Sequence, residues 1–225
     1  MNIQAPINFD SLPLDFILNA WLEELQVQGV EAVVILGPQV TGSASDRAVF
    51  AVHPPRFVFA AKALAKSADF GPTGLLTDAP AVHWELIEQA QAGADPARWR
   101  WLWSAYGFLS VVRVEFTLPG HRAFECFLMS KDATKMEARC AMAVWSTLSI
   151  WPKIRRSIGQ ARSPLTERET ECLRLALEGL TARETADRLE CGERTVTYFI
   201  NNAMSKFSAA NKLAAIQRAI WLGVI

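Results

Sequence analysis

The sequence lacks the long apolar runs that a membrane-spanning helix needs. The uncharged run 140–152 lies among its most apolar segments, and it is well short of the ~20 residues that cross a bilayer. No basic stretch followed by an apolar segment precedes Asn8, so no secretory leader is expected. With 51% hydrophobic residues the chain is nevertheless globular. These features predict a cytoplasmic protein that has no membrane partner.

Reactive side chains are also few. The cysteines and histidines are Cys126, Cys140, Cys172, Cys191, His53, His83 and His121. No C-x-x-C pair is present, which fits a reducing compartment in which cysteines serve as small apolar residues. The histidines stand alone, without a metal-binding, nucleophile-elbow or phosphate-loop pattern around them. We therefore expect no enzyme activity, no metal site and no tightly held cofactor.

Net charge is absent as well, because 23 basic residues balance 23 acidic ones, but the charges are unevenly placed. Residues 1–152 carry a net charge of −4, residues 153–163 carry +4, and residues 164–225 are balanced. We expect an N-terminal domain over 1–152, a basic linker over 153–163 and a small second domain over 164–225. The basic stretch either adds salt-sensitive affinity for phosphates or forms a solvated linker.

Two helix-start signals occur close together in the C-terminal region. Thr166 precedes Glu169 by three residues, and Thr181 precedes Glu184 in the same way, so each pair predicts a capping box that opens a helix. Cys172, Leu173, Ala176 and Leu177 form the expected inner face of the first helix. Gly179 is the predicted left-handed stop after it.

A third predicted helix, 193–207, has a polar stripe opposite its apolar one. Two capped helices joined by a tight turn form a helix-turn-helix, whose second helix lies in the DNA major groove. Arginine suits guanine edges or phosphates, and asparagine suits adenine edges. The alternative is an ordinary solvated helix face. On the first interpretation, the DNA-contacting residues are Thr181, Arg194, Thr195, Thr197, Tyr198, Asn201, Asn202 and Lys206.

The same residues carry a family resemblance. The motifs are Leu165-Thr166-x-Arg168-Glu169-x-Glu171-x-Leu173, Glu178-Gly179-x-Thr181, Glu184-x-Ala186, Arg194-Thr195-Val196 and Asn201-Asn202-x-Met204-x-Lys206. Together they resemble the DNA-binding domain of LuxR-type transcription regulators, whose most characteristic positions fall here on Glu169, Leu173 and Gly179. The resemblance implies a homodimer that binds double-stranded DNA at an inverted repeat. Pairing would involve the N-terminal domain and a final helix, 211–222, that offers Leu213, Ile216, Ile220 and Trp221.

The N-terminal region alternates between helix and strand patterns. We expect helices over 14–25, 57–67 and 82–91, one opened by Asp95-Pro96, and a long one from Asp132 to Pro152. Expected strands are 32–36, 48–52, 109–117 and 121–129. Arg113 and Glu115 alternate with Val112 and Val114, which predicts that one face of their strand is wet. The expected fold is an α/β sandwich, with helices packed on a mostly antiparallel sheet, followed by an all-α four-helix helix-turn-helix domain.

This element order resembles the signal-binding domain of LuxR-type regulators. Trp84 lies where the family keeps a pocket tryptophan, and Gly107 where it keeps a glycine before a strand. In the family, aromatics and an acidic residue followed by proline hold the ring and amide of an acyl-homoserine lactone. Here Asp69 is the nearest acid and no proline follows it. The expected ligand-binding residues are Phe57, Phe59, Asp69, Trp84, Trp101 and Tyr106.

Three functional alternatives follow. The divergent pocket favours a regulator that is independent of ligand or binds a non-standard small molecule. An ordinary lactone-responsive regulator is the second. The third is an antagonist that sequesters other LuxR-type regulators, because Thr197, Phe199 and Ser205 stand where the family often has basic residues or histidine. Gly192 also replaces a usual serine cap, which costs the helix only a few tenths of a kcal/mol.

Overall fold

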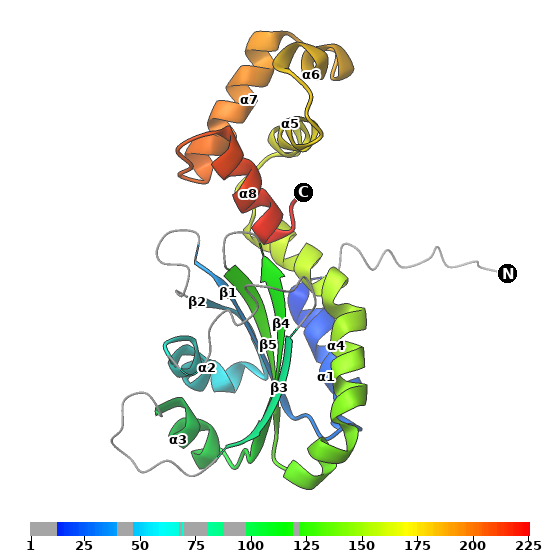
Figure 1. Cartoon of the computed structure of the whole chain (residues 1–225), viewed down its shortest axis with the longest axis vertical. Helices are drawn as coiled ribbons and strands as arrows, with labels where there is room; N and C mark the ends of the chain where they lie inside the picture. Colours follow the sequence, from blue (N-terminus) through cyan, green and yellow to red (C-terminus); the bar gives the residue numbers. More distant parts are fainter. Residues whose placement is uncertain (1–12, 40–46, 68, 70–80, 88–97, 119–121) are drawn as a thin grey trace, which may run out of the picture. The chain divides into compact units, whose positions relative to one another are not determined.

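The structure is a computed structural model that describes residues 13–39, 47–67, 69, 81–87, 98–118 and 122–225. The chain forms two compact units, Met1–Ile154 and Arg155–Ile225. The first is an α/β sandwich and the second is all-helical, as the sequence predicts (Figure 1). The helix start predicted at Asp95-Pro96 lies outside the described residues.

An antiparallel sheet of five strands organises the first unit. The strands are β1 (Ala32–Pro38), β2 (Arg47–His53), β3 (Ala81–Leu86), β4 (Ser110–Leu118) and β5 (Arg122–Ser130). Their spatial order is β2-β1-β5-β4-β3, so β2 and β3 are the edge strands. Every residue of β1 is buried, because strands flank it on both sides and helices cover both faces.

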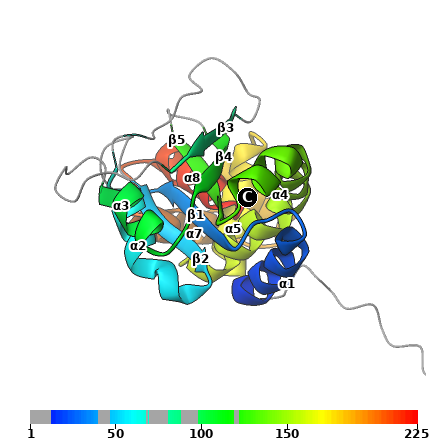
Figure 2. The same cartoon turned by 90° about the horizontal axis from the view of Figure 1, so that it is seen from below.

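Helices cover the two faces of this sheet as separate layers (Figures 1 and 2). On one face lie α1 (Leu14–Gln26) and the first part of α4 (Ala133–Arg162). There the Trp21 indole donates to Ser146 Oγ at 2.9 Å, and the rings of Trp151 and Phe116 stack with centroids 4.1 Å apart. On the other face lie the short η2 (Pro55–Phe57), α2 (Val58–Ala65) and α3 (Arg98–Ala105). Phe57, Trp103 and Phe108 form the aromatic centre of that second core.

The helix predicted over 82–91 is wrong, because residues 81–86 form β3. β3 pairs antiparallel with β4 and sets Trp84 opposite Val112. A short apolar run is ambiguous between helix and strand. Its β-branched and aromatic residues, Val82 and Trp84, alternate with polar ones, and the open edge of β4 decides the outcome.

The predicted wet face of β4 is also wrong. Arg113 and Glu115 are 2% and 0% exposed, and they lie on the sheet face that α2 and α3 cover. Arg113 donates from Nε to Glu125 Oε1 at 2.7 Å and from Nη2 to Glu115 Oε2 at 2.8 Å. Buried charges are tolerated when they are paired and hydrogen-bonded. The alternation of apolar and charged residues in β4 therefore corresponds to two buried faces.

Pro152 does not end the long helix, contrary to the prediction, and α4 continues through it to Arg162. A proline inside a helix removes one backbone hydrogen bond and crowds the preceding turn. Packing compensates on each side of it. Trp151 stacks on Phe116 within the first unit, and Arg155 and Gly159 contact α8 within the second. The predicted basic linker, 153–163, is therefore almost entirely helical.

The second unit contains α5 (Glu167–Leu177), α6 (Ala182–Arg188), α7 (Glu193–Lys206) and α8 (Lys212–Leu222). Both predicted capping boxes are confirmed, and Asn211 additionally caps α8 by accepting from the Ala214 N–H at 2.9 Å. Leu177 was predicted to point inward, but it is 48% exposed, whereas Leu175 is buried. The buried stripe of α5 is therefore rotated slightly from the predicted one.

Candidate functional site

The turn between α6 and α7 fixes the position of α7. Cys191 donates its backbone N–H to the Ala186 carbonyl at 3.0 Å, and Glu190 takes a left-handed φ of 52°. Gly192 precedes α7 without a side-chain cap, as the glycine predicts. Ala186 and Val196 are buried with Cys172 of α5, so the inner face of α7 is held by both preceding helices.

The opposite face of α7 is polar and open to solvent. Tyr198 is 61% exposed, and its neighbours on this face are also exposed. We call this set the outward face of α7: Arg194, Thr195, Thr197, Tyr198, Asn201 and Ser205. Asn202 lies half-buried at its margin. The Thr197 hydroxyl donates to the Glu193 carbonyl at 3.0 Å, so its oxygen keeps acceptor capacity. The outward face thus combines a guanidinium, hydroxyls and a carboxamide, with a second carboxamide at its margin.

Lys206 ends α7 and is tied to α5. Its Nζ lies 2.7 Å from Glu169 Oε2, the atom that also accepts from the Thr166 N–H at 2.7 Å. Burial of Glu169 favours its neutral form, but the hydrogen bonds and charge of Lys206 and the bond from Thr166 outweigh this and lower its pKa. Glu169 therefore closes a cap and anchors α7 with one carboxylate.

Leu173 and Gly179, the other two positions most characteristic of the family, have structural roles. Leu173 is fully buried in α5. Gly179 has φ of +92°, which an L side chain rarely adopts, although a Cβ there would meet nothing within 4 Å. Backbone conformation, and not space, is what requires glycine at this position.

Thr181 uses its hydroxyl in the cap of α6. Its Oγ1 accepts from the Glu184 N–H at 3.3 Å and donates to Glu184 Oε2 at 2.7 Å. Hydrogen bonds from the backbone and side chain of Thr181 lower the pKa of Glu184. The backbone of Thr181 is engaged by the same carboxylate, so this predicted contact residue is committed to the helix start.

Two residues of the basic stretch, Arg155 and Gly159, pack against α8, which the sequence did not indicate. Arg155 donates from Nη2 to the Ile220 carbonyl near the end of α8, and burial lowers its pKa. A Cβ at Gly159 would lie 2.6 Å from the Leu222 carbonyl oxygen, so only glycine allows this approach. The last turns of α4 are therefore part of the helical unit.

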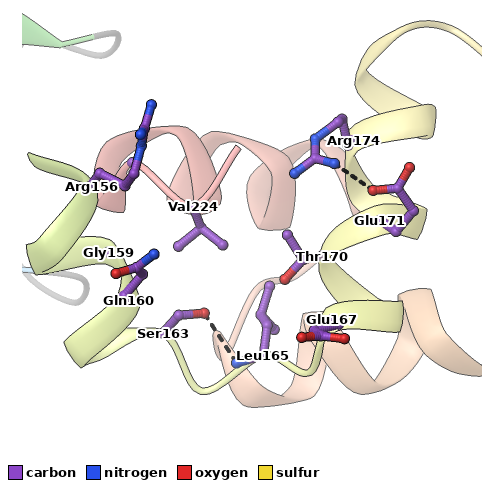
Figure 3. Close-up of a pocket in the computed structure, with 11 residues that line it drawn as sticks. Arg156, Gly159, Gln160, Ser163, Leu165, Glu167, Thr170, Glu171, Arg174 and Val224 are labelled. Carbon is purple, nitrogen blue, oxygen red and sulfur yellow. Dashed lines mark hydrogen bonds and ion pairs between the residues drawn. The ribbon is translucent and has the colours of Figure 1, made fainter. Parts of the chain in front are cut away.

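A cleft of about 610 Å³ lies in the second unit, and the residues that line it do not include those of the outward face of α7 (Figure 3). Its lining includes Gln160 from the end of α4, Ser163 just after that helix, Thr170 from α5 and Val224 near the C-terminus. Arg174 pairs with Glu171 at its rim. Its lining mixes both charge signs and offers no single ligand chemistry.

In the first unit, Asp69 is engaged by α3. Its Oδ2 accepts from the Trp99 indole at 2.7 Å and from Arg100 Nε at 3.4 Å. Arg100 also pairs with Glu85 of β3 at 3.2 Å and lies over the Trp99 ring. The acid that the family resemblance assigns to a ligand amide thus already has intramolecular donors.

The aromatic candidates do not converge on one point. Phe57 is buried, and its ring contacts that of Tyr106 with centroids 5.1 Å apart. Phe59 and Trp101 are 57% and 44% exposed on α2 and α3. Trp84 lies on the opposite face of the sheet, because it pairs with Val112 whereas the α2 and α3 core contains Val111.

Four buried charges lie on the sheet face beneath α2, where the sequence predicted solvent. We call Arg47, Glu125, Arg113 and Glu115 the buried ion network. Arg47 Nη1 lies 3.1 Å from Glu125 Oε2, and its Nη2 donates to the Leu64 and Ser67 carbonyls at the end of α2. The residues come from three strands, so only the folded sheet brings them together.

The described ranges hold neither a cluster of potential metal ligands nor a long apolar helix. There, no three His, Cys, Asp or Glu side chains gather as potential metal ligands. Within those same ranges, no helix combines the length and apolarity needed to span a bilayer.

The second unit has the architecture of a helix-turn-helix domain: two capped helices, α5 and α6, support a third, α7, whose polar face is outward. A family model described as bacterial regulatory proteins, luxR family, matches residues 163–219. The C-terminal domain of this chain therefore belongs to the luxR family of bacterial regulatory proteins.

Individual relatives agree with this assignment. The chain is 36% identical over 84 residues to the transcriptional activator protein LuxR of Aliivibrio fischeri, a match that covers 37% of this chain and 34% of that protein. It is 44% identical over 126 residues to the transcriptional activator protein VanR of Vibrio anguillarum, covering 51% and 52%. A third, SolR of Ralstonia nicotianae, is 32% identical over 123 residues, covering 55% and 50%. The matches thus span between a third and about half of these relatives.

Solved structures similar to this chain include SdiA in complex with octanoyl-rac-glycerol. That likeness has a TM-score of 0.44 and 17% identity, and covers 95% of this chain and 91% of the other. A crystal structure of Escherichia coli SdiA gives a TM-score of 0.43 at 17% identity, covering 97% and 95%.

Proposed function

We propose that this protein is a transcription regulator that binds double-stranded DNA through α7. The outward face of α7 carries the proposal, because it presents a guanidinium, hydroxyls and a carboxamide on a helix whose inner face is packed against α5 and α6. Such groups match base edges and phosphates in the major groove. The luxR-family match over residues 163–219 supports the same function.

Arg194 and Asn201 have the central roles in this proposal. Arg194, in the first turn of α7, suits a guanine edge or a phosphate, and Asn201, two turns on, suits an adenine edge. Tyr198, Thr195 and Thr197 add hydroxyl contacts. The Lys206 ammonium is already paired with the Glu169 carboxylate, so it contributes less affinity for a phosphate than an unpaired lysine.

Footprinting on DNA upstream of the gene tests the function. The expected result is protection of an inverted repeat. Arg194→Ala and Asn201→Ala should each weaken binding to that site by roughly 1–3 kcal/mol. Arg174→Ala is the matched control, because this arginine lies on α5, where it is paired with Glu171. Its substitution should leave the affinity for DNA unchanged. Unchanged affinity in both α7 variants would reject the outward face as the reading surface.

The regulator is proposed to act as a homodimer, since paired half-sites lie about 34 Å apart and one helix-turn-helix covers a single half-site. Two of the α8 residues expected at a dimer contact, Ile216 and Trp221, are only 5% and 7% exposed. They are therefore buried within the helical unit itself. Leu213 is 74% exposed and remains available. Light scattering that shows only monomer at micromolar concentration, with and without DNA, would contradict the dimer.

The first unit is proposed to fold without an acyl-homoserine lactone. Two observations support this: Asp69 already accepts from Trp99 and Arg100, and the buried ion network occupies the sheet face beneath α2. Purified protein should melt cooperatively, and its melting temperature should not change across a lactone panel at tens of micromolar. A rise of several degrees that Asp69→Ala abolishes would restore the lactone-responsive alternative.

The antagonist role is the second candidate. The bond from Lys206 to Glu169 favours it, because a tied cation weakens phosphate anchoring. If the purified homodimer bound no DNA at low salt but bound another LuxR-type regulator, sequestration would replace DNA binding as the proposed function.

A further inference from the structure

The two edge strands of the sheet differ in how they are covered. β2 packs against α1 and α2, whereas β3 has β4 as its one strand neighbour in the described part of the chain. Alternate residues on one side of β3, Val82, Trp84 and Leu86, are 42%, 36% and 50% exposed. Figure 2 shows β3 at the margin of the sheet, beyond β4.

An edge of this kind is an exposed template for strand pairing. Soluble proteins protect edge strands with lysine, proline or a bulge. β3 has the sequence Ala-Val-His-Trp-Glu-Leu, which contains neither lysine nor proline, and its pairing with β4 runs in an unbroken register. The apolar side and a backbone edge that no described strand pairs therefore belong to the same six residues.

The sequence of β3 is complementary to itself in one antiparallel register. With Trp84 opposite Trp84 of a second copy, Val82 faces Leu86 and His83 faces Glu85 in both directions. Aromatic and apolar cross-strand pairs favour pairing. The His83 ring can in addition hydrogen-bond Glu85 of the other copy, a carboxylate that binds Arg100 within its own chain. Moving the centre to His83 loses this match, because Glu85 would then face Ala81 and Leu86 would have no partner within β3.

We propose that β3 pairs antiparallel with β3 of a second copy of this chain, with Trp84 at the twofold axis. The pairing joins the two sheets edge to edge and covers the exposed sides of Val82, Trp84 and Leu86. A twofold contact of this kind is isologous, so the same patch serves both copies. The proposal rests on the homodimer of the proposed function, but it does not depend on DNA binding.

A competing surface for the same partner lies on α4. Met142 and Trp145 are 60% and 70% exposed there. This surface is more exposed than β3, but a helix offers no backbone edge for strand pairing. Trp145 therefore supplies a matched control for Trp84, because both are solvent-exposed tryptophans of the same unit.

Cysteine cross-linking of the full-length protein tests the register directly. Trp84→Cys should form an interchain disulfide on mild oxidation, because residues directly opposite in a strand pair have Cβ atoms about 4.5–5.5 Å apart. Val82→Cys alone and Leu86→Cys alone should not, since like residues would be separated by roughly 13 Å along the strands. A mixture of those two variants should cross-link. Wild type reports any contribution of the native cysteines.

Trp145→Cys completes the cross-linking test. Cross-linking through residue 145 and not through residue 84 would overturn the proposal in favour of α4. Equal cross-linking of Val82→Cys alone and of the mixture would overturn the register.

Sedimentation equilibrium without DNA provides the second readout. Wild type and Trp145→Glu should approach twice 24.9 kDa at tens of micromolar, and Trp84→Glu should associate at least tenfold more weakly. Circular dichroism and a cooperative melt establish that Trp84→Glu is folded, and Leu86→Glu repeats the test at a more exposed position. A monomeric wild type, or a dimeric Trp84→Glu and Leu86→Glu, would overturn the β3 pairing. The Arg194 and Asn201 variants still decide DNA binding separately.

Discussion

The two units of this protein place their charges in opposite ways. In the helical unit the capping carboxylates bond three residues back along the chain, as Glu169 does to Thr166. In the sandwich, the buried ion network joins residues as distant in sequence as Arg47 and Glu125. The capping bonds of the helical unit are local, whereas the network of the sandwich is non-local and dry. The difference predicts how strongly each unit responds to the loss of a single charge.

The largest effect is expected in the buried ion network. Glu125→Gln removes the carboxylate shared by Arg47 and Arg113 and leaves buried guanidinium groups without full compensation. Breaking such a pair typically costs about 3–5 kcal/mol. The free energy of unfolding of the first unit in urea, monitored by hydrogen exchange of peptides from its strands, should decrease by this amount. The control replaces the whole network by apolar residues, Arg47→Met, Arg113→Met, Glu115→Leu and Glu125→Leu together, and it should recover part of the stability because no buried charge is left unpaired. An effect below 1 kcal/mol would contradict a tightly coupled network.

Glu169→Gln should give the next largest effect, in the helical unit. It weakens charge-assisted bonds from Lys206 and Thr166 that are worth roughly 1.5–3 kcal/mol each. Because the folded pKa of Glu169 is lowered from its usual 4.5, its contribution is present above that pH and is lost as the pH falls through the folded pKa. Hydrogen exchange over residues 163–219 at pH 7 and pH 3 measures this.

The same measurement on Glu171→Gln is the control for Glu169. Glu171 is an exposed partner of Arg174. Its substitution should leave the pH dependence of the helical unit unchanged. If Glu169→Gln kept the wild-type acid sensitivity, Glu169 would not be the group responsible.

A smaller loss is expected at the start of α8. Asn211→Ala removes the side-chain acceptor of the Ala214 N–H and should destabilise the helical unit by about 1 kcal/mol. Asn211→Ser retains an acceptor and should recover most of that loss. Thermal melts of the three proteins give the comparison, and equal losses in both variants would argue against a capping role.

The smallest effect is expected at an exposed ion pair. Arg174→Ala breaks the pair with Glu171 on the surface of α5, and such pairs contribute roughly 0.2–1 kcal/mol. The predicted change in unfolding free energy is at the low end of that range and should vanish at high salt. A loss as large as that of Glu125→Gln would remove the contrast between the two units.

The sequence predicted the local features well. Capping boxes are read from residues three apart, and the outward face of α7 follows from the helical period, so both were available without a structure. The strand pattern over 109–117 was also predicted. Its burial was not, because the partners of Arg113 lie on another strand and the covering helix α2 lies far away in sequence.

Non-local contacts explain the remaining errors. β3 took its conformation from the edge of β4, and α4 passed Pro152 because packing on both sides outweighed the local cost. The bond between Lys206 and Glu169, 37 residues apart, had no sequence signal either. Each of these depends on which elements meet in the folded chain, and periodicity does not contain that information.

We propose that the outward face of α7 contacts the DNA bases. The affinity of the full-length chain for the DNA site protected in the footprint tests this most directly. Titration of wild type, Arg194→Ala and Asn201→Ala should be made on that site and on a site with the contacted base pair changed. We predict that each variant loses roughly 1–3 kcal/mol on the original site and discriminates less against the altered one. Equal affinity of all three proteins for both sites would contradict the claim.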